Sequence, residues 1–129
     1  MTRPVDQSRA AGYLTKAENS LHIAKIAFKE KAYDAAVMNA VHSSINALDA
    51  LTTLYSGKRS SGQHTDVFDL IKGILTNDEF EYVKKQFGGL MSMKNESEYQ
   101  PNLMNDKDAQ NAVTRAERIL DKVKTRIKK

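Results

Sequence analysis

The sequence predicts an all-α fold, an up-and-down antiparallel bundle of four long helices plus one short helix. Three observations support this prediction. Apolar residues recur every three or four positions through most of Gln7–Lys128, strand-type alternation is absent, and the two prolines, Pro4 and Pro101, lie outside the periodic segments. Short connections between these segments favour antiparallel neighbours.

The first two helices are expected at Ser8–Lys29 and Tyr33–Tyr55. The first carries one apolar stripe with charged residues beside it, so it covers the core from one side. The second has apolar residues around much of its circumference and almost no charge. We therefore expect it to be central and packed on more than one side. Its apolar residues are Ala36, Val37, Ala40, Val41, Ile45, Leu48, Leu51 and Leu54.

A turn and a short helix follow. The segment Ser56–Gln63 contains two glycines and three serines, a composition typical of a turn. The short helix is expected at Thr65–Ile74, with Val67, Leu70 and Ile71 directed inward.

The fourth helix begins at a capping box and contains two adjacent glycines. In Thr76–Glu79, the hydroxyl and the carboxylate can satisfy two backbone donors reciprocally. Gly88 and Gly89 each cost roughly 1 kcal/mol of helix stability relative to alanine. We therefore expect a kink or a close helix contact there. The apolar stripe of this helix consists of Phe80, Val83, Phe87 and Leu90.

The last helix has a cap and a continuous apolar stripe. Asn105 or Asp106 can cap its first turn. Its stripe has the helical spacing of a core-facing surface. The stripe consists of Ala109, Ala112, Val113, Ala116, Ile119, Leu120, Val123 and Ile127.

Length and composition indicate one soluble domain. We expect residues 1–129 to form a single domain, frayed at 1–7 and at 126–129. The absence of cysteine excludes disulfides and thiolate metal sites. No apolar run is long enough to cross a membrane, and Met1–Ala10 lacks the apolar segment of a secretory signal. A cytoplasmic location is the simplest expectation.

Positive charge is concentrated at the C-terminus. Asp121–Lys129 contains five cations and one carboxylate, an excess of four that equals the formal net charge of +4. Cations in the last turns of a helix complement its macrodipole, which is a purely structural interpretation. Contact with nucleic acid is the functional alternative.

The polar hexamer Lys94–Tyr99 interrupts the apolar pattern at the end of the fourth helix. Asn95 and Tyr99 are four residues apart and share a helix face, while Lys94 continues the apolar line. A cation, an amide and a phenol are residue types that can hold a phosphate or a base. The hexamer is therefore the main candidate site.

The order of these features resembles the HEPN domain (higher eukaryotes and prokaryotes nucleotide-binding). The resemblance rests on Tyr13–Glu18, on Tyr33–Ala36 leading an alanine-rich helix into a glycine-containing loop and His64, and on Met93–Tyr99 followed by Ala116–Arg118. It covers nearly the whole chain. It implies an all-helical bundle, often dimeric, so that residues 1–129 form one HEPN-like domain.

Many members of this family carry an arginine, a polar residue and, after four to six intervening positions, a histidine. In those members the motif serves a metal-independent ribonuclease. By position, Lys94 replaces the arginine, Asn95 matches the polar residue and Tyr99 stands near the histidine. Lysine lacks the planar fork of arginine, and tyrosine, with a reference pKa of about 10, is a poor proton acceptor. Glu96 and Glu98 add negative charge. These departures argue against catalysis and leave nucleotide or RNA binding open.

A literal match to the family spacing occurs elsewhere, at Arg59 and His64. It lies in the loop after the second helix, where the family motif does not lie. A solvated loop arginine and a histidine opening the short helix explain the match without a function. His64 is kept as a secondary catalytic candidate and Arg59 as a binding candidate.

A polar line on the most apolar helix supplies further candidates. His42, Asn46 and Asp49 occur at i, i+4 and i+7. In the functional interpretation they line a cleft facing Lys94 and Tyr99, with Asp49 orienting His42 or pairing with Lys94. In the structural interpretation they form the partly exposed edge of a two-sided helix.

Two functions follow from these observations. The first is a homodimeric HEPN protein that binds nucleotide or RNA where two copies of the fourth helix meet. The resemblance also implies a minimal nucleotidyltransferase partner in a toxin–antitoxin type pair, and any enzymatic activity would be that of a metal-independent endoribonuclease. The alternative is a non-catalytic helical dimerisation or partner-binding module. The histidine and carboxylate spacings show no metal motif, and we expect no cofactor.

Overall fold

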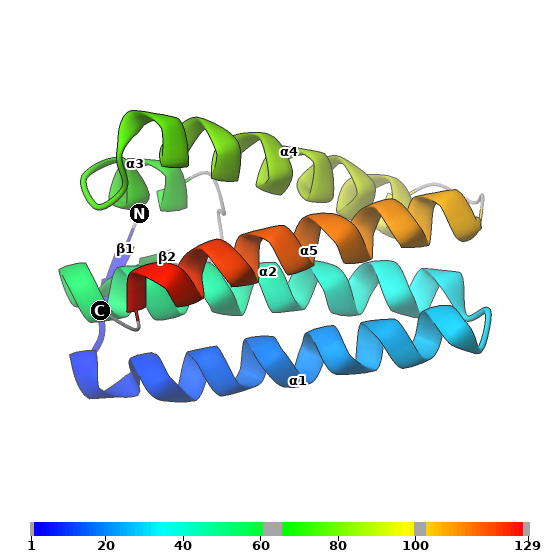
Figure 1. Ribbon diagram of the computed structural model, residues 1–129, viewed down its shortest axis with the longest axis horizontal. Coiled ribbons are helices and arrows are strands. Elements are labelled where there is room, and N and C mark those ends of the chain that lie inside the picture. The colour runs from blue at the N-terminus through cyan, green and yellow to red at the C-terminus, as the bar shows by residue number, and fades with distance from the viewer. Residues whose placement is uncertain (1, 61–65, 100–102, 128–129) are drawn as a thin grey trace.

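The fold is a bundle of four long helices with one short helix at one end (Figure 1). The structure is a computed structural model that describes residues 2–60, 66–99 and 103–127. Its helices confirm the predicted all-α bundle. The elements are β1 (Thr2–Pro4), the 3-10 helix η1 (Gln7–Arg9), α1 (Ala10–Lys29), α2 (Tyr33–Ser56), β2 (Lys58–Ser60), α3 (Asp66–Lys72), α4 (Asn77–Tyr99) and α5 (Asp106–Ile127).

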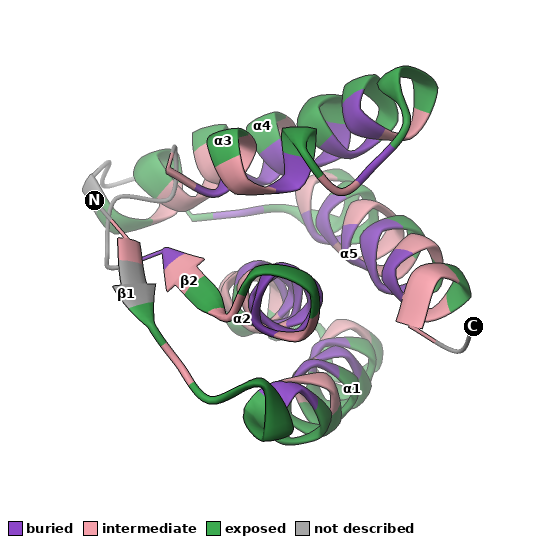
Figure 2. Cartoon of the chain, turned by 90° about the vertical axis from the view of Figure 1, so that its left-hand side faces the viewer, coloured by how far each residue is buried: buried purple, intermediate pink, exposed green. Residues whose placement is uncertain are grey.

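Helix α2 is the centre of the bundle, as its composition predicts. It packs against α1, α3, α4 and α5. Viewed along the bundle, the buried parts of the surrounding helices turn toward the interior, and α2 is buried around much of its circumference (Figure 2). Among the largest fully buried side chains are Leu48, Leu51, Ile71, Phe87, Leu90 and Ile119.

Two short strands form a β-ribbon that the sequence analysis does not predict. One strand lies in residues 1–7, which are expected to fray, and the other lies in the turn expected at Ser56–Gln63. Strands β1 and β2 pair antiparallel, with Thr2 opposite Ser60. The chain can turn into the ribbon because the residue after α2, Gly57, has a φ of 63°, a left-handed conformation that costs glycine little. The chain then turns back past the N-terminal segment, and the Val5 N–H donates to the Gly57 carbonyl at 2.9 Å. The ribbon lies at one end of the bundle and leaves the helical core intact.

Both predicted helix caps are present. The Glu79 N–H donates to the Thr76 hydroxyl at 3.2 Å, and the Thr76 N–H donates to the Glu79 carboxylate at 3.0 Å. At the last helix, the Asp108 N–H donates to the Asn105 side chain at 2.9 Å. Of the two candidate caps there, Asn105 is the residue that serves.

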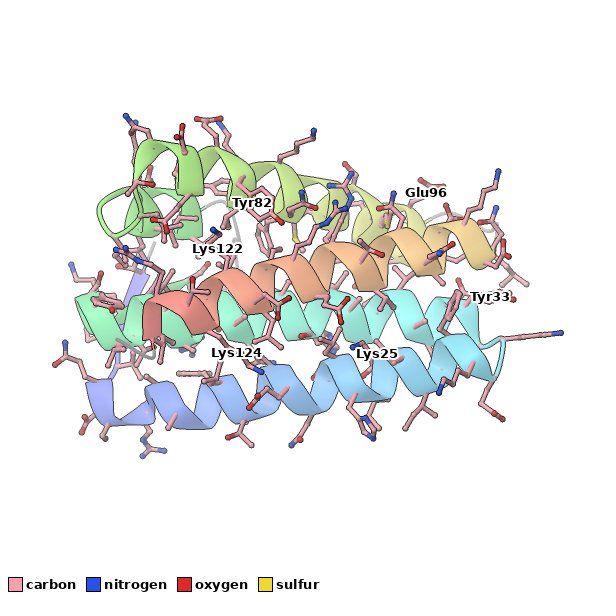
Figure 3. All side chains as sticks on the ribbon, in the orientation of Figure 1. Lys25, Tyr33, Tyr82, Glu96, Lys122 and Lys124 are labelled. Carbon is pink, nitrogen blue, oxygen red and sulfur yellow. The ribbon has the colours of Figure 1, made fainter. Side chains whose placement is uncertain are left out.

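The cations described in the last two turns of α5 each contact another element. The contacts are Lys122 over the ring of Tyr82 (5.6 Å to its centroid), Lys124 to Glu18 (2.7 Å) and Arg126 to Glu79 (3.7 Å). Arg126 also donates to the Ile74 carbonyl at 2.9 Å. Figure 3 shows Tyr82, Lys122 and Lys124 in these positions. The C-terminal charge run therefore ties α5 to its neighbours, which favours the structural interpretation of that run.

Gly89 provides the close helix contact that the glycine pair predicts. A Cβ atom there would lie 2.5 Å from the guanidinium carbon of Arg115 on α5. That guanidinium donates to the Lys85 carbonyl of α4 at 3.1 Å and to the Asn111 side chain at 2.7 Å. Gly88 has nothing within 4 Å of the same position. Gly89 thus lets an arginine lie directly on the α4 backbone.

Replacing the two glycines one at a time separates helix propensity from this contact. Gly88→Ala is expected to raise the free energy of unfolding by about 1 kcal/mol, because alanine is the better helix former and the site is open. Gly89→Ala gains the same propensity but displaces Arg115 from the Lys85 carbonyl, which costs about 1 kcal/mol or more. Urea unfolding measures both values. Equal stabilisation by the two substitutions would contradict this contact. In an Arg115→Ala background, where the contact is already absent, Gly89→Ala should stabilise the protein as much as Gly88→Ala does.

Candidate functional site

Lys94, the residue in place of the family arginine, already has an intramolecular partner. Its ammonium lies 3.0 Å from the Glu98 carboxylate, one turn further along α4. The two side chains are only 23 % and 32 % exposed. A lysine paired in this way is partly neutralised and sterically confined. Lys94 is therefore a weaker phosphate ligand than its sequence position indicates.

The helical geometry of α4 separates the residues of the hexamer. Successive residues turn by about 100° around an α-helix, so Lys94 follows the line of the buried Leu90 while Asn95 is exposed beside Gly88. The helical position of Tyr99, four residues after Asn95, lies on this same outer face. The α4 backbone therefore groups Asn95 with Tyr99, and places Lys94 on a different side.

The polar line of α2 does not form the predicted cleft. His42 is exposed, and the Asn46 amide donates to the His42 carbonyl at 2.9 Å within the same helix. Asp49 is buried, with 6 % of its surface exposed. Because Lys94 is paired with Glu98, the predicted ion pair between Asp49 and Lys94 is wrong. His42 and Asp49 are seven residues apart on α2, about 10 Å along the helix axis, so Asp49 does not orient His42 directly.

Asp49 instead lies near Arg59, a candidate taken from a different part of the sequence. Burial of Asp49 raises its pKa to about 6, and the positive charge of Arg59 opposes part of that shift. Arg59 is half-buried and donates to the Ser60 carbonyl at 3.1 Å. His64, which matches the family spacing together with Arg59, lies outside the described residues. The structure therefore places two candidate residues, Asp49 and Arg59, close enough to interact electrostatically, although they come from different motifs in the sequence.

A polar, cationic surface runs along the outside of α5. It surrounds a shallow cavity of about 310 Å³, and we call it the α5 cationic face. Its residues recur every three or four positions, opposite the buried stripe that begins at Ala109. Three of the residues are cations, and none of the described residues that line the cavity is a carboxylate. The face consists of Lys107, Gln110, Asn111, Thr114, Arg115 and Arg118.

The α5 cationic face lies beside the C-terminal half of α4. Arg115 reaches the α4 backbone at Lys85 and Gly89. Because α4 and α5 are antiparallel, the positions from Arg115 back to Lys107 run toward the α4 C-terminus, where Asn95 lies. Figure 3 shows Glu96 in this region, above the N-terminal half of α5. The face and the outer side of the hexamer thus form adjoining surfaces.

The sequence carries a signal for this face, although none of the predicted site residues belongs to it. Lys107, Arg115 and Arg118 occur at i, i+8 and i+11, which places them on one side of a helix whose opposite side is apolar. The densest run of charge lies further along the same helix, at the C-terminus. Its cations Lys122, Lys124 and Arg126 bind neighbouring elements instead.

The architecture is that of a helical-bundle domain, and one comparison with known proteins places it in a family, while a second shows a shared fold. The family model for the HEPN domain matches residues 10–126, so the chain belongs to the HEPN family. The crystal structure of TT1696 from Thermus thermophilus superposes with a TM-score of 0.72 at 20 % sequence identity, covering 92 % of this chain and 98 % of that one. This likeness shows a shared fold. No curated protein matches the chain.

Residues 2–60, 66–99 and 103–127 were also compared with the requirements of a membrane span and of a metal site. None of the helices in these ranges is long and apolar enough to cross a membrane. No three histidine, aspartate or glutamate side chains gather there in a way that could hold a metal ion.

The buried Asp49 predicts a pH dependence of stability. Its folded-state pKa of about 6 lies above the ordinary value of 3.8, so the folded state binds the proton more tightly than the unfolded state. The resulting cost is absent below pH 4, grows as the pH rises from about 4 to 6, and reaches about 3 kcal/mol at neutral pH. Asp49→Asn is therefore expected to stabilise the protein at pH 7, by about 1–3 kcal/mol, and hardly at all at pH 4.

Urea unfolding at both pH values measures this difference. Asp121→Asn, at an exposed position of α5, controls for the loss of a carboxylate. An Asp49→Asn effect of equal size at pH 4 and pH 7 would show that packing, and not ionisation, sets the contribution of this residue.

Proposed function

We propose that this HEPN protein binds single-stranded RNA without cleaving it, through the α5 cationic face and the adjoining outer side of α4. The observation that supports this proposal is the α5 cationic face itself. It presents Lys107, Arg115 and Arg118 around a cavity whose described lining residues include no carboxylate. These residues span about 16 Å of helix axis, enough for more than one phosphate group. Cations spaced along a surface are the main source of affinity for a nucleic-acid backbone.

The outer side of α4 next to these cations carries two neutral polar residues, and the exposed Glu96 adds one carboxylate beside them. Asn95 is exposed there, and the position of Tyr99 lies on the same face. We assign the Asn95 amide to hydrogen bonding with a base edge and the Tyr99 phenol to base stacking. Lys94 remains paired with Glu98 in this proposal.

The residue chemistry supports binding rather than cleavage. A ribonuclease of the family type needs a group that accepts the proton of the ribose hydroxyl near pH 7. Tyr99, with a reference pKa of about 10, is poorly suited to this role. Lys94 offers a point charge that is already paired with Glu98, instead of a bidentate fork for phosphate.

Membership of the HEPN family supports two partners. One is a second copy of this chain, with the two α4 helices close together, because HEPN domains often dimerise. The other is a minimal nucleotidyltransferase in a toxin–antitoxin type pair. Both are proposals that follow from the family and not from a contact in this structure.

A second candidate function is a helical interaction module without RNA affinity. Two exposed isoleucines on the outer side of α1 favour it: Ile23 is 47 % exposed and Ile26 is 44 % exposed, one turn apart. This module would associate through α1 and leave the α5 cationic face unused. RNA binding distinguishes the two functions.

The direct test is fluorescence anisotropy with a labelled single-stranded RNA carrying a 5′-hydroxyl, in the presence of a chelator. We expect Lys107→Gln combined with Arg118→Gln to weaken binding roughly 10-fold or more. The slope of log affinity against log salt concentration should fall by about 0.7 for each phosphate that the double variant no longer neutralises. Arg115 is left in place because it also anchors α4. Electrophoresis of the same samples should show intact RNA.

Lys29→Gln combined with Lys72→Gln, at exposed positions of α1 and α3, removes the same number of charges, so this double variant is the matched control and should retain the affinity of the wild type. An equal loss of affinity in this control would show that net charge, and not the α5 cationic face, determines binding. Absence of RNA binding by the wild type would favour the interaction module.

A further inference from the structure

A second groove lies at the end of the bundle that holds the β-ribbon, away from the α4 C-terminus (Figure 1). The segment Pro4–Asp6 forms one wall, the first two turns of α1 form another, and Arg59 of β2 completes the lining. Its volume of about 560 Å³ falls within the range of roughly 300–1,000 Å³ that is typical of small-molecule sites. The groove is therefore large enough for one small ligand.

Backbone and side-chain hydrogen bonds fix the walls of this groove. The Val5 N–H donates to the Gly57 carbonyl at 2.9 Å, and the Gln7 amide donates to the Leu54 carbonyl at 3.0 Å. Together with the β-ribbon, these bonds hold the N-terminal segment against the C-terminal end of α2. The groove is a pre-formed feature of the fold, so a ligand would not have to order it.

The charge in the groove is mainly positive. Arg9, Lys16 and Arg59 all line it, and within the described parts of the chain neither Arg9 nor Lys16 forms a salt bridge. Asp6 is the carboxylate in the lining, and it already accepts the Ser8 N–H at 2.9 Å. The groove therefore favours an anionic ligand.

Arg59 is the most constrained of the three cations. It is half-buried, its guanidinium donates to the Ser60 carbonyl at 3.1 Å, and its charge acts on the buried Asp49 behind it. A guanidinium held in this way presents its remaining donors without a large loss of side-chain entropy. It is suited to an oxyanion such as phosphate.

An aromatic ring lies between these cations. Tyr13 is half-buried and lines the groove, and Arg9, Tyr13 and Lys16 occur at i, i+4 and i+7 on one face of the helix that starts at Ala10. A ring flanked by cations combines a stacking surface for a flat heterocycle with binding of the phosphate attached to it.

We propose that this groove binds a nucleoside phosphate, with the phosphate held by Arg9, Lys16 and Arg59 and the base stacked on Tyr13. The site is distinct from the α5 cationic face, because the β-ribbon and α5 lie on opposite sides of α2 (Figure 2). The same chemistry occurs in a free mononucleotide and in the 5′-phosphorylated end of an RNA. The proposal goes beyond RNA backbone binding and does not depend on it.

Isothermal titration with AMP, adenosine and inorganic phosphate tests this proposal. AMP is expected to bind with a Kd of about 1 mM or tighter, and each of its two parts should bind at least roughly 10-fold more weakly. Tyr13→Leu should weaken AMP binding about 5-fold or more while leaving phosphate binding unchanged, because only the stacking is removed. Lys16→Gln should weaken both ligands.

Controls separate these effects from folding and from the RNA surface. Lys29→Gln, at the other end of α1, should bind AMP as the wild type does. Lys16 is exposed, so its substitution keeps the test valid even if Tyr13→Leu destabilises the fold. Lys107→Gln combined with Arg118→Gln should retain AMP binding, while Lys16→Gln should retain binding of 5′-hydroxyl RNA. Failure of one proposal is therefore distinguishable from failure of the other.

Competition identifies the source of the ligand. Displacement of AMP by a 5′-phosphorylated trinucleotide, but not by its 5′-hydroxyl form, would assign the groove to an RNA end. No displacement by either would assign it to a free nucleotide. Absence of AMP binding up to about 10 mM, or equal affinities of Lys16→Gln and Lys29→Gln for AMP, would overturn the proposal.

Discussion

The burial of α2 on nearly all sides is the constraint on which the rest of the structure depends. The helix has little charge, and its core-facing residues are mostly alanine, valine and leucine, so its partners must surround it closely. One buried hydroxyl of α2 also joins it to α1, because Ser43 donates to the Ala17 carbonyl at 2.8 Å. Once α1, α4 and α5 have turned their apolar stripes toward α2, their polar faces must point outward. The packing of the core on α2 therefore determines which polar residues lie on the proposed functional surfaces.

The helices and their caps could be predicted from the sequence because both depend on local patterns. Apolar spacing identifies α1, α2, α4 and α5, and the cap residues Thr76 and Asn105 each accept from the backbone N–H three residues further on. The β-ribbon could not be predicted in this way. Its strands are three residues long, too short for alternation, and their pairing depends on the left-handed turn at Gly57.

The candidate site was less accessible to sequence reasoning because it depends on contacts between elements. The i, i+4 spacing of Lys94 and Glu98 is readable in the sequence and lies within one helix, so this ion pair is an exception that spacing could have indicated. Spacing does not show that Asp49 meets Arg59, since these residues are joined only through the turn after α2. The α5 cationic face is different: its spacing is readable in the sequence, and the structure adds that Arg115 fixes the face against Gly89 of α4. Tertiary structure thus decides which charges remain available to a ligand.

The central functional claim is that RNA lies along α5 and the outer side of α4. The most direct measurement is a titration of isotopically labelled protein with single-stranded 5′-hydroxyl RNA, followed through the backbone amide chemical shifts. The account predicts changes concentrated at residues 107–118 and 88–99, with α1 largely unaffected. Changes confined to α1, or spread evenly over every lysine-bearing surface, would contradict it.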